Sequence, residues 1–500
     1  MLRLLYEAPS SLDPEKAGSV YESLPINQIF NGLVALDATM NVVPSLASTW
    51  TITRDGLTYE FHLRPGVRFH DGSPLTAEDV VFTIRRLLAP GRPQRNVAAS
   101  YLDAVEGASD YAAGRRGDLP GVTAEGREIV RIRLERPYLS FLQVLAMDGL
   151  KIVPQAVVER IGDEAFGRAP IGTGSFRLAS WDSGGLRLAA WEGCFLDPPR
   201  LDVVEILSPA AGESDGGVGR FDRGETDVLE VPAKEIGRFS HADGVRLHRY
   251  QELNLHYLGF CTAIPPLDDI RVRQAIAHAV DPRVLVDEFP GARREATGIL
   301  PPGLQGFSPE PKTLAFSRET SRRLLAEAGY PEGRGLPPIE LLAASSRMDV
   351  IRRAETLSAQ AATVGIRMNV RQVSWGELSR RVEAKRAPAF LLGWIADLPD
   401  PDSFLRTPFE PGGTANYFDL RDATVASLLD QGGREMNPVL RTKIYRQTER
   451  LILQLAPLVP LYHSVGLLAV RSRVGGFDPG PLGLSAVDLS RTWVSPGGGR

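Results

Sequence analysis

The sequence predicts a mixed α/β protein built from more than one domain. Three observations support this. A chain of 500 residues is too long for one ordinary hydrophobic core. Segments in which apolar residues recur with helical spacing are mixed with segments in which apolar and polar residues alternate. One run, near 339–373, has the order strand, helix, strand, which is typical of a parallel βαβ unit.

The first clear elements lie between residues 57 and 91. Residues 57–63 alternate between apolar and polar side chains, Pro65-Gly66 makes a turn, and residues 67–69 resume the alternation. We expect two strands joined as a hairpin. Thr76 then stands three residues before Asp79, a variant of the capping box, and the apolar spacing that follows predicts a helix ending at Pro90-Gly91.

Further helices are predicted from apolar spacing and end signals. One begins at Asp268-Asp269, where the helix dipole favours acids. The others are expected over 318–328, 349–364 and 438–455. Gly365 ends the second of these, and the alternation after it predicts a strand from Ile366 to Val370. In the last helix, the apolar stripe is assigned to Leu440, Ile444, Leu451 and Leu455.

Composition excludes several classes of partner. The formal net charge is −4, with 43% apolar and 24% charged residues, so neither nucleic acid nor an anionic membrane is indicated. The two cysteines, Cys194 and Cys261, form no CxxC pair. No apolar run reaches about 18 residues, and Met1 is not followed by a signal peptide. The chain is therefore cytoplasmic or is numbered after a leader.

The search for catalytic chemistry finds little. Gly172-Thr173-Gly174 lacks the lysine and spacing of a phosphate loop, so a tight turn is the better interpretation. His62, His70 and Asp71 are imaginable metal ligands, but strand positions already explain the histidines. No GxSxG nucleophile motif occurs. A pair of carboxylates of the glycosidase type stays open, because 61 acidic residues offer many pairs.

The stretch G-W-I-A-D-L-P-D-P-D-S-F-L over 393–405 is the most unusual. Asp400 and Asp402 are explained by turn formation, because a short carboxylate bonds nearby backbone N–H groups. That explanation does not cover Trp394, three residues before Asp397. An indole beside a carboxylate suits a ligand amine, which gains a charge-assisted hydrogen bond and a cation–π contact.

Stretches spread in order over nearly the whole chain resemble one family. The most specific is D-G-L-T-Y-E-F-H-L-R-P-G-V-R-F-H-D-G-S-P-L-T-A-E-D-V-V-F over 55–82. The others are S-L-D-P (11–14), I-F-N-G-L-V-A-L-D (29–37), V-V-P-S-L-A-S-T-W (42–50), G-T-G-S-F-R-L (172–178), D-D-I-R-V-R-Q-A-I-A-H-A-V-D (268–281), L-L-A-E-A-G-Y-P (324–331), G-W-I-A-D-L-P-D-P-D (393–402) and A-P-L-V-P-L-Y (456–462). The set resembles the extracytoplasmic solute-binding proteins of ABC transporters, family 5, which include oligopeptide-, dipeptide- and nickel-binding members.

The resemblance implies a bilobal periplasmic-binding-protein-like fold, in which two mixed α/β lobes joined by a hinge close on a ligand. The implied bounds are 1–45, 169–258 and 474–500 for lobe I, 46–168 for a subdomain inserted in lobe I, and 259–473 for lobe II. The hinge is expected near 255–264 and 468–476. Pro265-Pro266, a linker candidate from its stiff prolines alone, fits that boundary.

The resemblance also implies a site. In peptide-binding relatives, an aspartate three residues after the Gly-Trp tryptophan takes the α-ammonium group of the ligand, which here corresponds to Asp397 and Trp394. Further ligand contacts are expected from Tyr21, Tyr257, Asn416, Tyr417 and Asp400. Two departures bear on specificity: W-E-G-C-F over 191–195 replaces the usual Asn-Pro-x-Tyr-Trp, and Cys261 replaces a frequent Asn.

We therefore expect a monomeric, non-enzymatic substrate-binding component of an ABC importer. It would carry a di- or oligopeptide to membrane permease subunits in the periplasm, or another extracytoplasmic location, with no catalytic residue, cofactor or metal. Three alternatives stay open. The same fold could bind another solute, such as a nickel chelate, an opine-like compound, glutathione or an oligosaccharide; the chain could be a ligand-sensing regulatory domain; or it could be a hydrolase using cleft carboxylates.

Overall fold

The computed structural model describes residues 1–17, 20–91, 96–209, 215–310, 314–344, 348–413 and 415–495. The chain forms two compact units. Unit 1 is Met1–Tyr250 with Gly466–Arg500, and unit 2 is Gln251–Val465. The chain thus passes between the units twice, after Tyr250 and after Val465. The lobe bounds implied by the family resemblance, including the subdomain at 46–168, remain a prediction.

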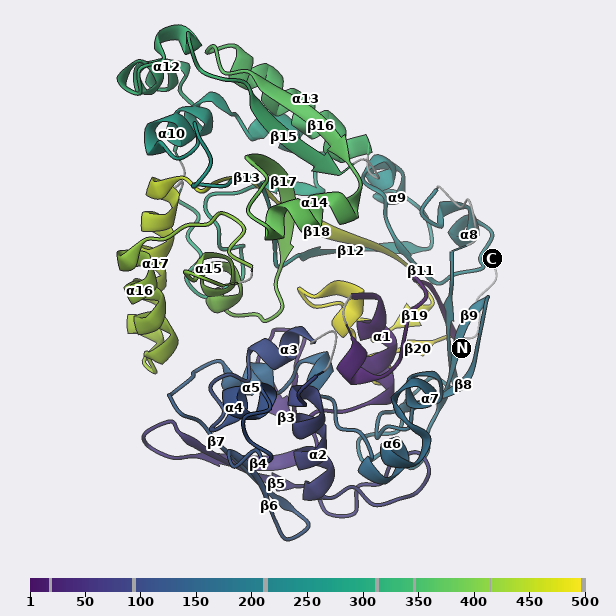
Figure 1. The fold of residues 1–500 in the computed structure, drawn as a ribbon. Coiled ribbons are helices and arrows are strands. Elements are labelled where there is room, and N and C mark those ends of the chain that lie inside the picture. The colour runs from purple at the N-terminus through teal and green to yellow at the C-terminus, as the bar shows by residue number, and fades with distance from the viewer. Residues whose placement is uncertain are drawn as a thin grey trace. The chain divides into compact units, whose positions relative to one another are not determined.

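Unit 1 contains a mixed sheet with the strand order β18-β11-β1-β10-β9-β8. Its members are β1 (Leu2–Leu5), β8 (Phe176–Asp182), β9 (Gly185–Ala190), β10 (Val203–Leu207), β11 (Val228–Glu230) and the end of β18 (Leu458–Arg471). Strands β8, β9 and β11 of this sheet are labelled in Figure 1. The N-terminal strand β1 lies between β10 and β11 and is parallel to both. Its alternate residues Leu2 and Leu4 are fully buried in the core of this unit, because successive strand side chains point to opposite faces.

Helices and short strands complete unit 1. The helices are α1 (Val20–Ile29), α3 (Val97–Ser100), α4 (Ala108–Ala112), α5 (Phe141–Val144), α6 (Gln155–Ile161), α7 (Asp163–Arg168), α8 (Val218–Asp222) and α9 (Ile236–Phe239). The short strands are β2 (Val34–Leu36), β3 (Val42–Pro44), β19 (Val474–Gly475) and β20 (Trp493–Val494), while β12 (Val245–Gln251) ends at the first crossing. Gly172 and Gly174 lie against α1, where an added Cβ would stand 2.0 Å from the Ile29 carbonyl oxygen and 2.2 Å from that of Gln28. The two glycines therefore permit close backbone packing in the predicted turn.

A second, antiparallel sheet of unit 1 has the order β4-β5-β7-β6. Its strands are β4 (Ala47–Ile52), β5 (Thr58–Leu63), β6 (Val122–Glu125) and β7 (Ile129–Arg133), and α2 (Ala77–Leu88) follows β5 in the chain. The carboxylate of Asp79 accepts hydrogen bonds from the backbone and the hydroxyl of Thr76, which confirms the predicted helix start. The predicted hairpin is wrong. Strand β5 pairs with β4 and β7 instead, so neither of its edges is left for residues 67–69.

Unit 2 contains a sheet with the order β16-β15-β17-β13-β18, and β14 also pairs with β18. The strands not yet defined are β13 (Asn254–Phe260), β14 (Arg293–Glu295), β15 (Ile339–Ala344), β16 (Met368–Val373) and β17 (Ala389–Ile395). Strands β15 and β16 are parallel, which confirms the predicted βαβ unit. Strand β17 is also parallel to β15, so β15, β16 and β17 end at the same edge of the sheet.

Helices make up much of the rest of unit 2. They are α10 (Ile270–Ala279), α11 (Arg283–Asp287), α12 (Arg318–Glu327), α13 (Met348–Ala362), α14 (Trp375–Glu383), α15 (Pro401–Phe409), α16 (Ala423–Arg434) and α17 (Pro438–Leu455). Residues of α10, α12 and α13 form one core with Leu258 and Phe260 of β13. Tyr257 comes directly before Leu258 in β13 and faces the opposite side of the strand, where its ring contacts Phe390 and Phe418.

The buried face of α17 differs from the predicted one. Leu440 is 46% exposed, while its neighbour Arg441 is 1% exposed. Tyr445, Thr448, Glu449, Ile452 and Leu453 are buried with Arg441. The buried face of α17 therefore lies one residue further along the helix than the predicted apolar stripe, and it carries polar groups as well as apolar ones. These polar groups are hydrogen-bonded within the unit, as burial of polar atoms requires.

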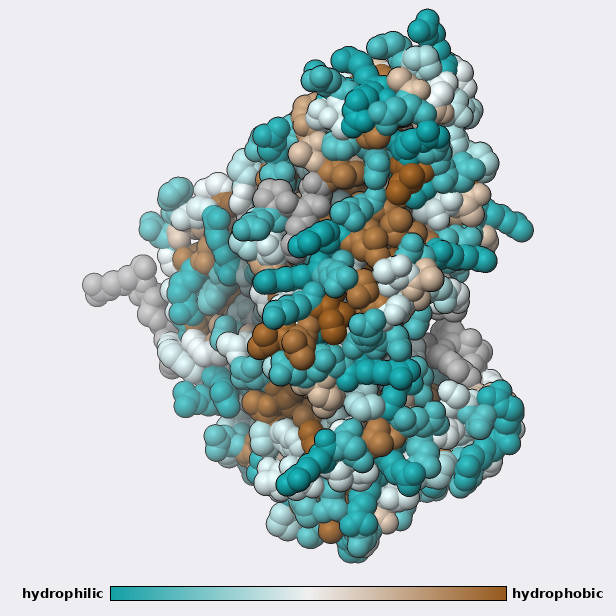
Figure 2. All heavy atoms as spheres, turned by 90° about the vertical axis from the view of Figure 1, so that its left-hand side faces the viewer, coloured by the Kyte–Doolittle hydropathy of each residue, from teal (hydrophilic) through white to brown (hydrophobic). Residues whose placement is uncertain are grey.

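The molecular surface mixes polar and apolar side chains. On the face drawn in Figure 2, apolar patches lie among a larger area of hydrophilic side chains. The most exposed large apolar side chains include Val439, Trp375 and Ile395. Within the described ranges, no helix combines the length and the apolar character needed to cross a bilayer.

Candidate ligand-binding site

Trp394 and Asp397 are held by one residue of the next helix. Trp394 lies near the end of β17, and its indole N–H donates to the carbonyl oxygen of Ser403 at 2.7 Å. The backbone N–H of Asp397 donates to the hydroxyl oxygen of Ser403 at 3.0 Å. Ser403 is fully buried in the first turn of α15. The end of β17 and the loop that follows it are thus fixed at both predicted residues, and Asp397 itself is half-buried.

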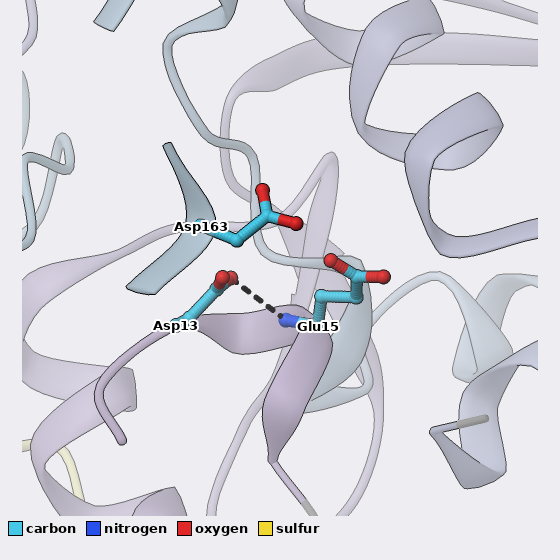
Figure 3. Close-up of side chains that lie close together, drawn as sticks. All are labelled: Asp13, Glu15 and Asp163. Atoms are coloured by element: carbon cyan, nitrogen blue, oxygen red, sulfur yellow. Dashed lines mark hydrogen bonds between the residues drawn. The ribbon is translucent and has the colours of Figure 1, made fainter. Parts of the chain in front are cut away.

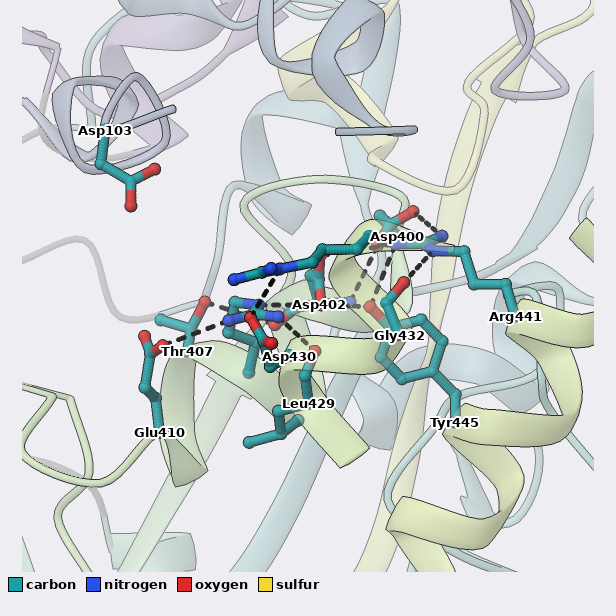
Figure 4. Close-up of polar contacts among 12 residues, drawn as sticks. Asp103, Asp400, Asp402, Thr407, Glu410, Leu429, Asp430, Gly432, Arg441 and Tyr445 are labelled. Carbon is teal, nitrogen blue, oxygen red and sulfur yellow. Dashed lines mark hydrogen bonds and ion pairs between the residues drawn. The ribbon is translucent and has the colours of Figure 1, made fainter. Parts of the chain in front are cut away.

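The other two carboxylates of this stretch lie inside unit 2. Asp400 is the N-cap of α15, because its side chain accepts from the backbone N–H of Asp402 at 2.9 Å. Arg441 of α17 donates two hydrogen bonds to the Asp400 carboxylate, at 2.7 and 2.8 Å, and lies 3.4 Å from that of Asp402 (Figure 4). This fork geometry makes a strong, buried ion pair. The turn interpretation of Asp400 is confirmed by its capping role.

Asp402 is the most buried acid of the group. Burial raises the pKa of the Asp402 carboxyl, and the neighbouring charge of Asp400 raises the pKa further, while Arg406 and Arg441 oppose the shift. Tyr445 donates its hydroxyl to the same carboxylate (Figure 4). The network thus joins the start of α15 to α17 through buried, satisfied polar groups.

Tyr417 lies close to this loop. Its ring meets that of Trp394 edge to face, with 6.5 Å between centroids. Burial raises the pKa of the Tyr417 hydroxyl first, and the negative charges of Glu383 and Asp397 add to the shift. The Lys385 ammonium lies 5.6 Å from the centroid of the Tyr417 ring. Trp394, Tyr417 and Asp397 therefore form one group in unit 2, which offers two aromatic rings and one carboxylate.

The remaining predicted residues differ in burial and in their contacts. Tyr257 and Asn416 are each 2% exposed. The Asn416 side chain bonds the backbone of Glu410 and Leu420, which gives it a structural task. Tyr21 belongs to unit 1, is 43% exposed, and contacts the ring of Tyr6 edge to face. Ligand contacts by Tyr21, Tyr257, Asn416 and Asp400 remain predictions.

Only one group of side chains in the described part of the chain has the composition of a metal site. Asp13, Glu15 and Asp163 of unit 1 bring their carboxylates close together (Figure 3). The guanidinium of Arg86 reaches all three: it bonds Asp13 at 2.9 Å and Asp163 at 2.8 Å, and lies 3.0 Å from Glu15. A protein cation already pairs with all three acids, so the cluster is an ion-pair network that ties the N-terminal segment to α2 and α7.

Sequence reasoning missed two residues of the candidate site. Ser403 carried no signal beyond its position at the start of a helix, and its oxygens become important only when β17 lies beside it. Arg441 was hidden by the assumed apolar stripe of α17. The one sequence signal for Arg441 was its place directly after Leu440 of the predicted stripe. Asp400 and Asp402 would need a cation as partner if they were buried.

Comparison with known proteins agrees with this architecture. The family model described as bacterial extracellular solute-binding proteins, family 5, middle region, matches residues 41–416. Heme-binding protein A of Haemophilus influenzae is 28% identical over 480 residues, covering 92% of this chain and 86% of that protein. The dipeptide-binding protein of Escherichia coli is 28% identical over 504 residues, covering 95% and 91%. A dipeptide-binding protein from Pseudoalteromonas, solved with Met-Leu, superposes with a TM-score of 0.79 at 25% identity, covering 99% of this chain and 100% of that one.

Two mixed α/β units with strands crossing twice between them define the class of bilobal, periplasmic-binding-protein-like folds. Because the family model spans well over half of the sequence, the chain belongs to the family 5 bacterial extracellular solute-binding proteins. The predicted family and fold class are confirmed. The curated relatives named above are binding proteins for small solutes.

Proposed function

We propose that this protein is the extracytoplasmic substrate-binding component of an ABC importer and that it captures a small peptide. Asp397 takes the α-ammonium group of the peptide, and Trp394 and Tyr417 pack beside it. The observation that carries the proposal is the loop between β17 and α15. Of the three acids in residues 393–405, Asp400 and Asp402 are buried with Arg441, while Asp397 is half-buried. The charge of Asp397 acts on the Tyr417 hydroxyl, and the Tyr417 ring contacts that of Trp394.

The chemistry of this group suits an ammonium ion. A carboxylate gives a charge-assisted hydrogen bond to an N–H⁺ donor, and the faces of tryptophan and tyrosine attract cations. The dipeptide-binding relative from Escherichia coli and the structure solved with Met-Leu support a peptide as the ligand. Delivery to permease subunits and the absence of enzymatic activity are proposed from family membership. Extracytoplasmic location is supported by family membership too, since the family is described as extracellular.

Isothermal titration with Met-Leu tests the proposal. Asp397→Asn keeps the size of the side chain but removes its charge, so binding should weaken by about 2–5 kcal/mol, or roughly 30- to 4,000-fold. Asp430→Asn serves as the matched control, because Asp430 is exposed and pairs with Arg434 on the surface of α16. Equal affinity of the wild type and Asp397→Asn would show that the carboxylate is not the anchor. Hemin in place of Met-Leu tests the ligand of the Haemophilus influenzae relative.

A further inference from the structure

We propose that Ser403 is the positioning residue of the ligand site, acting on the ligand through Asp397 and Trp394 without touching it. The inference rests on the proposed function for its effect on binding. Its structural basis is independent of the ligand: one fully buried serine accepts hydrogen bonds from both residues that carry the site.

The two hydrogen bonds constrain different parts of the site. The carbonyl oxygen of Ser403 receives the indole N–H of Trp394, which fixes the in-plane orientation of the ring. The hydroxyl oxygen receives the backbone N–H of Asp397, which fixes the main chain at the residue that bears the carboxylate. A side chain that starts from a fixed backbone atom has only its own torsions left to vary, so little freedom is lost when it binds.

Ser403 is itself rigidly placed. Its backbone N–H donates to the carbonyl oxygen of Asp400 at 3.1 Å, within the capped first turn of α15. Arg441 holds the Asp400 carboxylate by two bonds, and Asp402 is held by Arg441 and Tyr445. The contacts therefore run from α17, through the buried carboxylates and the first turn of α15, to Ser403 and the loop.

The hydroxyl group is the replaceable part of this arrangement. Ser403→Ala leaves the carbonyl oxygen and its bond to Trp394 in place, but removes the acceptor for the Asp397 N–H. That N–H must then find water or another acceptor, and the loop gains freedom. Ser321→Ala is the matched control. Ser321 is also fully buried on a helix of unit 2, and its hydroxyl bonds the Ala275 carbonyl oxygen in the core.

Amide hydrogen exchange without ligand tests the structural part. Peptides covering 393–399 should exchange faster in Ser403→Ala than in the wild type, and Ser321→Ala should leave their exchange unchanged. Exchange that is equal in Ser403→Ala and the wild type overturns the proposal, whatever the protein binds. Thermal unfolding of both variants shows that each is folded and reports the general cost of losing one buried hydroxyl.

A double-mutant cycle with Met-Leu as the probe tests the link to binding. We expect Ser403→Ala to weaken Met-Leu binding about three- to tenfold, the range for one net hydrogen bond. In the Asp397→Asn background the same change should have almost no effect, because the hydroxyl group of Ser403 acts through Asp397 and its carboxylate. N-acetyl-Met-Leu, which lacks the ammonium group, should bind the wild type and Ser403→Ala equally.

Two outcomes of the cycle overturn the positioning role. One is unchanged Met-Leu affinity in Ser403→Ala although Asp397→Asn weakens binding. The other is the same loss from Ser403→Ala in both backgrounds, which a general loss of stability would produce. If Asp397→Asn binds Met-Leu like the wild type, or the wild type does not bind Met-Leu, the proposed function fails instead. In that case the hydrogen-exchange experiment, which needs no ligand, still tests whether Ser403 holds the loop in place.

Discussion

Removing the buried cation of the α15–α17 network should destabilise unit 2 strongly. Arg441→Met keeps a long, unbranched side chain in a position that is 1% exposed, but it takes away the guanidinium. Asp400 and Asp402, which are 4% and 0% exposed, are then left near one another without their shared cation. A buried carboxylate that loses its partner retains the full cost of its desolvation.

The magnitude follows from the contacts that are lost. Arg441 donates two charge-assisted bonds to Asp400, at 2.7 and 2.8 Å, and one to the Gly432 carbonyl oxygen at 3.0 Å. Breaking a buried ion pair on one side costs about 3–5 kcal/mol. The matched control is Arg434→Met, because the Arg434–Asp430 pair on α16 has the same charges but side chains more than half exposed. Its loss should cost about 0.5 kcal/mol or less.

The pH dependence gives a second, independent readout. Burial and the Asp400 charge raise the pKa of the Asp402 carboxyl in the folded protein, and loss of Arg441 should raise the pKa of Asp402 further. An acid with a raised pKa favours the folded state when protonated. Its contribution to stability is complete below the unfolded pKa of 3.8 and is lost as the pH rises through the folded pKa. The deficit of Arg441→Met should therefore be largest near neutral pH and shrink as the pH falls.

Urea unfolding followed by tryptophan fluorescence, at several pH values, measures both effects. Unit 2 contains Trp375 and Trp394, so its transition is visible. The two units need not unfold together, and the transition of unit 2 is the one to compare. A cost for Arg441→Met no larger than that for Arg434→Met, or a cost that does not change with pH, would refute the reasoning.

Two further changes test unit 1. In Gly466→Ala, the new Cβ would stand 2.0 Å from the Tyr250 ring, so the protein should lose about 1–3 kcal/mol of stability and its melting temperature should fall. Adding Tyr250→Leu to this variant should recover part of the lost stability. An unchanged melting temperature in Gly466→Ala would contradict the packing. Burial lowers the pKa of His70 from 6.5 to about 4, and its ring accepts from the Gly172 N–H and bonds the Gly174 carbonyl oxygen. The neutral ring therefore stabilises the fold above pH 6.5, and this stabilisation is lost as the pH falls toward 4. The urea midpoint of His70→Gln should therefore change less between pH 6.5 and 4 than that of the wild type. An equal change of the midpoint with pH in both proteins would contradict this account.

Part of the candidate site was visible in the sequence because its signal is local. Trp394 at the end of β17 and Asp397 in the loop after it are three residues apart, so their pairing needed no knowledge of the fold. The capping function of Asp400 is equally local, since the bonded N–H is two residues away. The partners that hold this loop could not be found in the same way. Arg441 lies on another helix, 41 positions from Asp400, and nothing near it in the sequence specifies the contact.

The sequence by itself determined the α/β class, the βαβ unit, the capping box at Thr76 and the range of α17, because each depends on periodicity or on contacts within a few residues. Tertiary structure decided which strands flank β5, which face of α17 is buried, and which atoms meet Ser403. These features depend on packing between distant segments. In α17, the ion pair of Arg441 with Asp400 decides which face is buried, although the apolar residues predict a face one residue away. A buried charge must find its partner, whereas leucine tolerates partial exposure at modest cost.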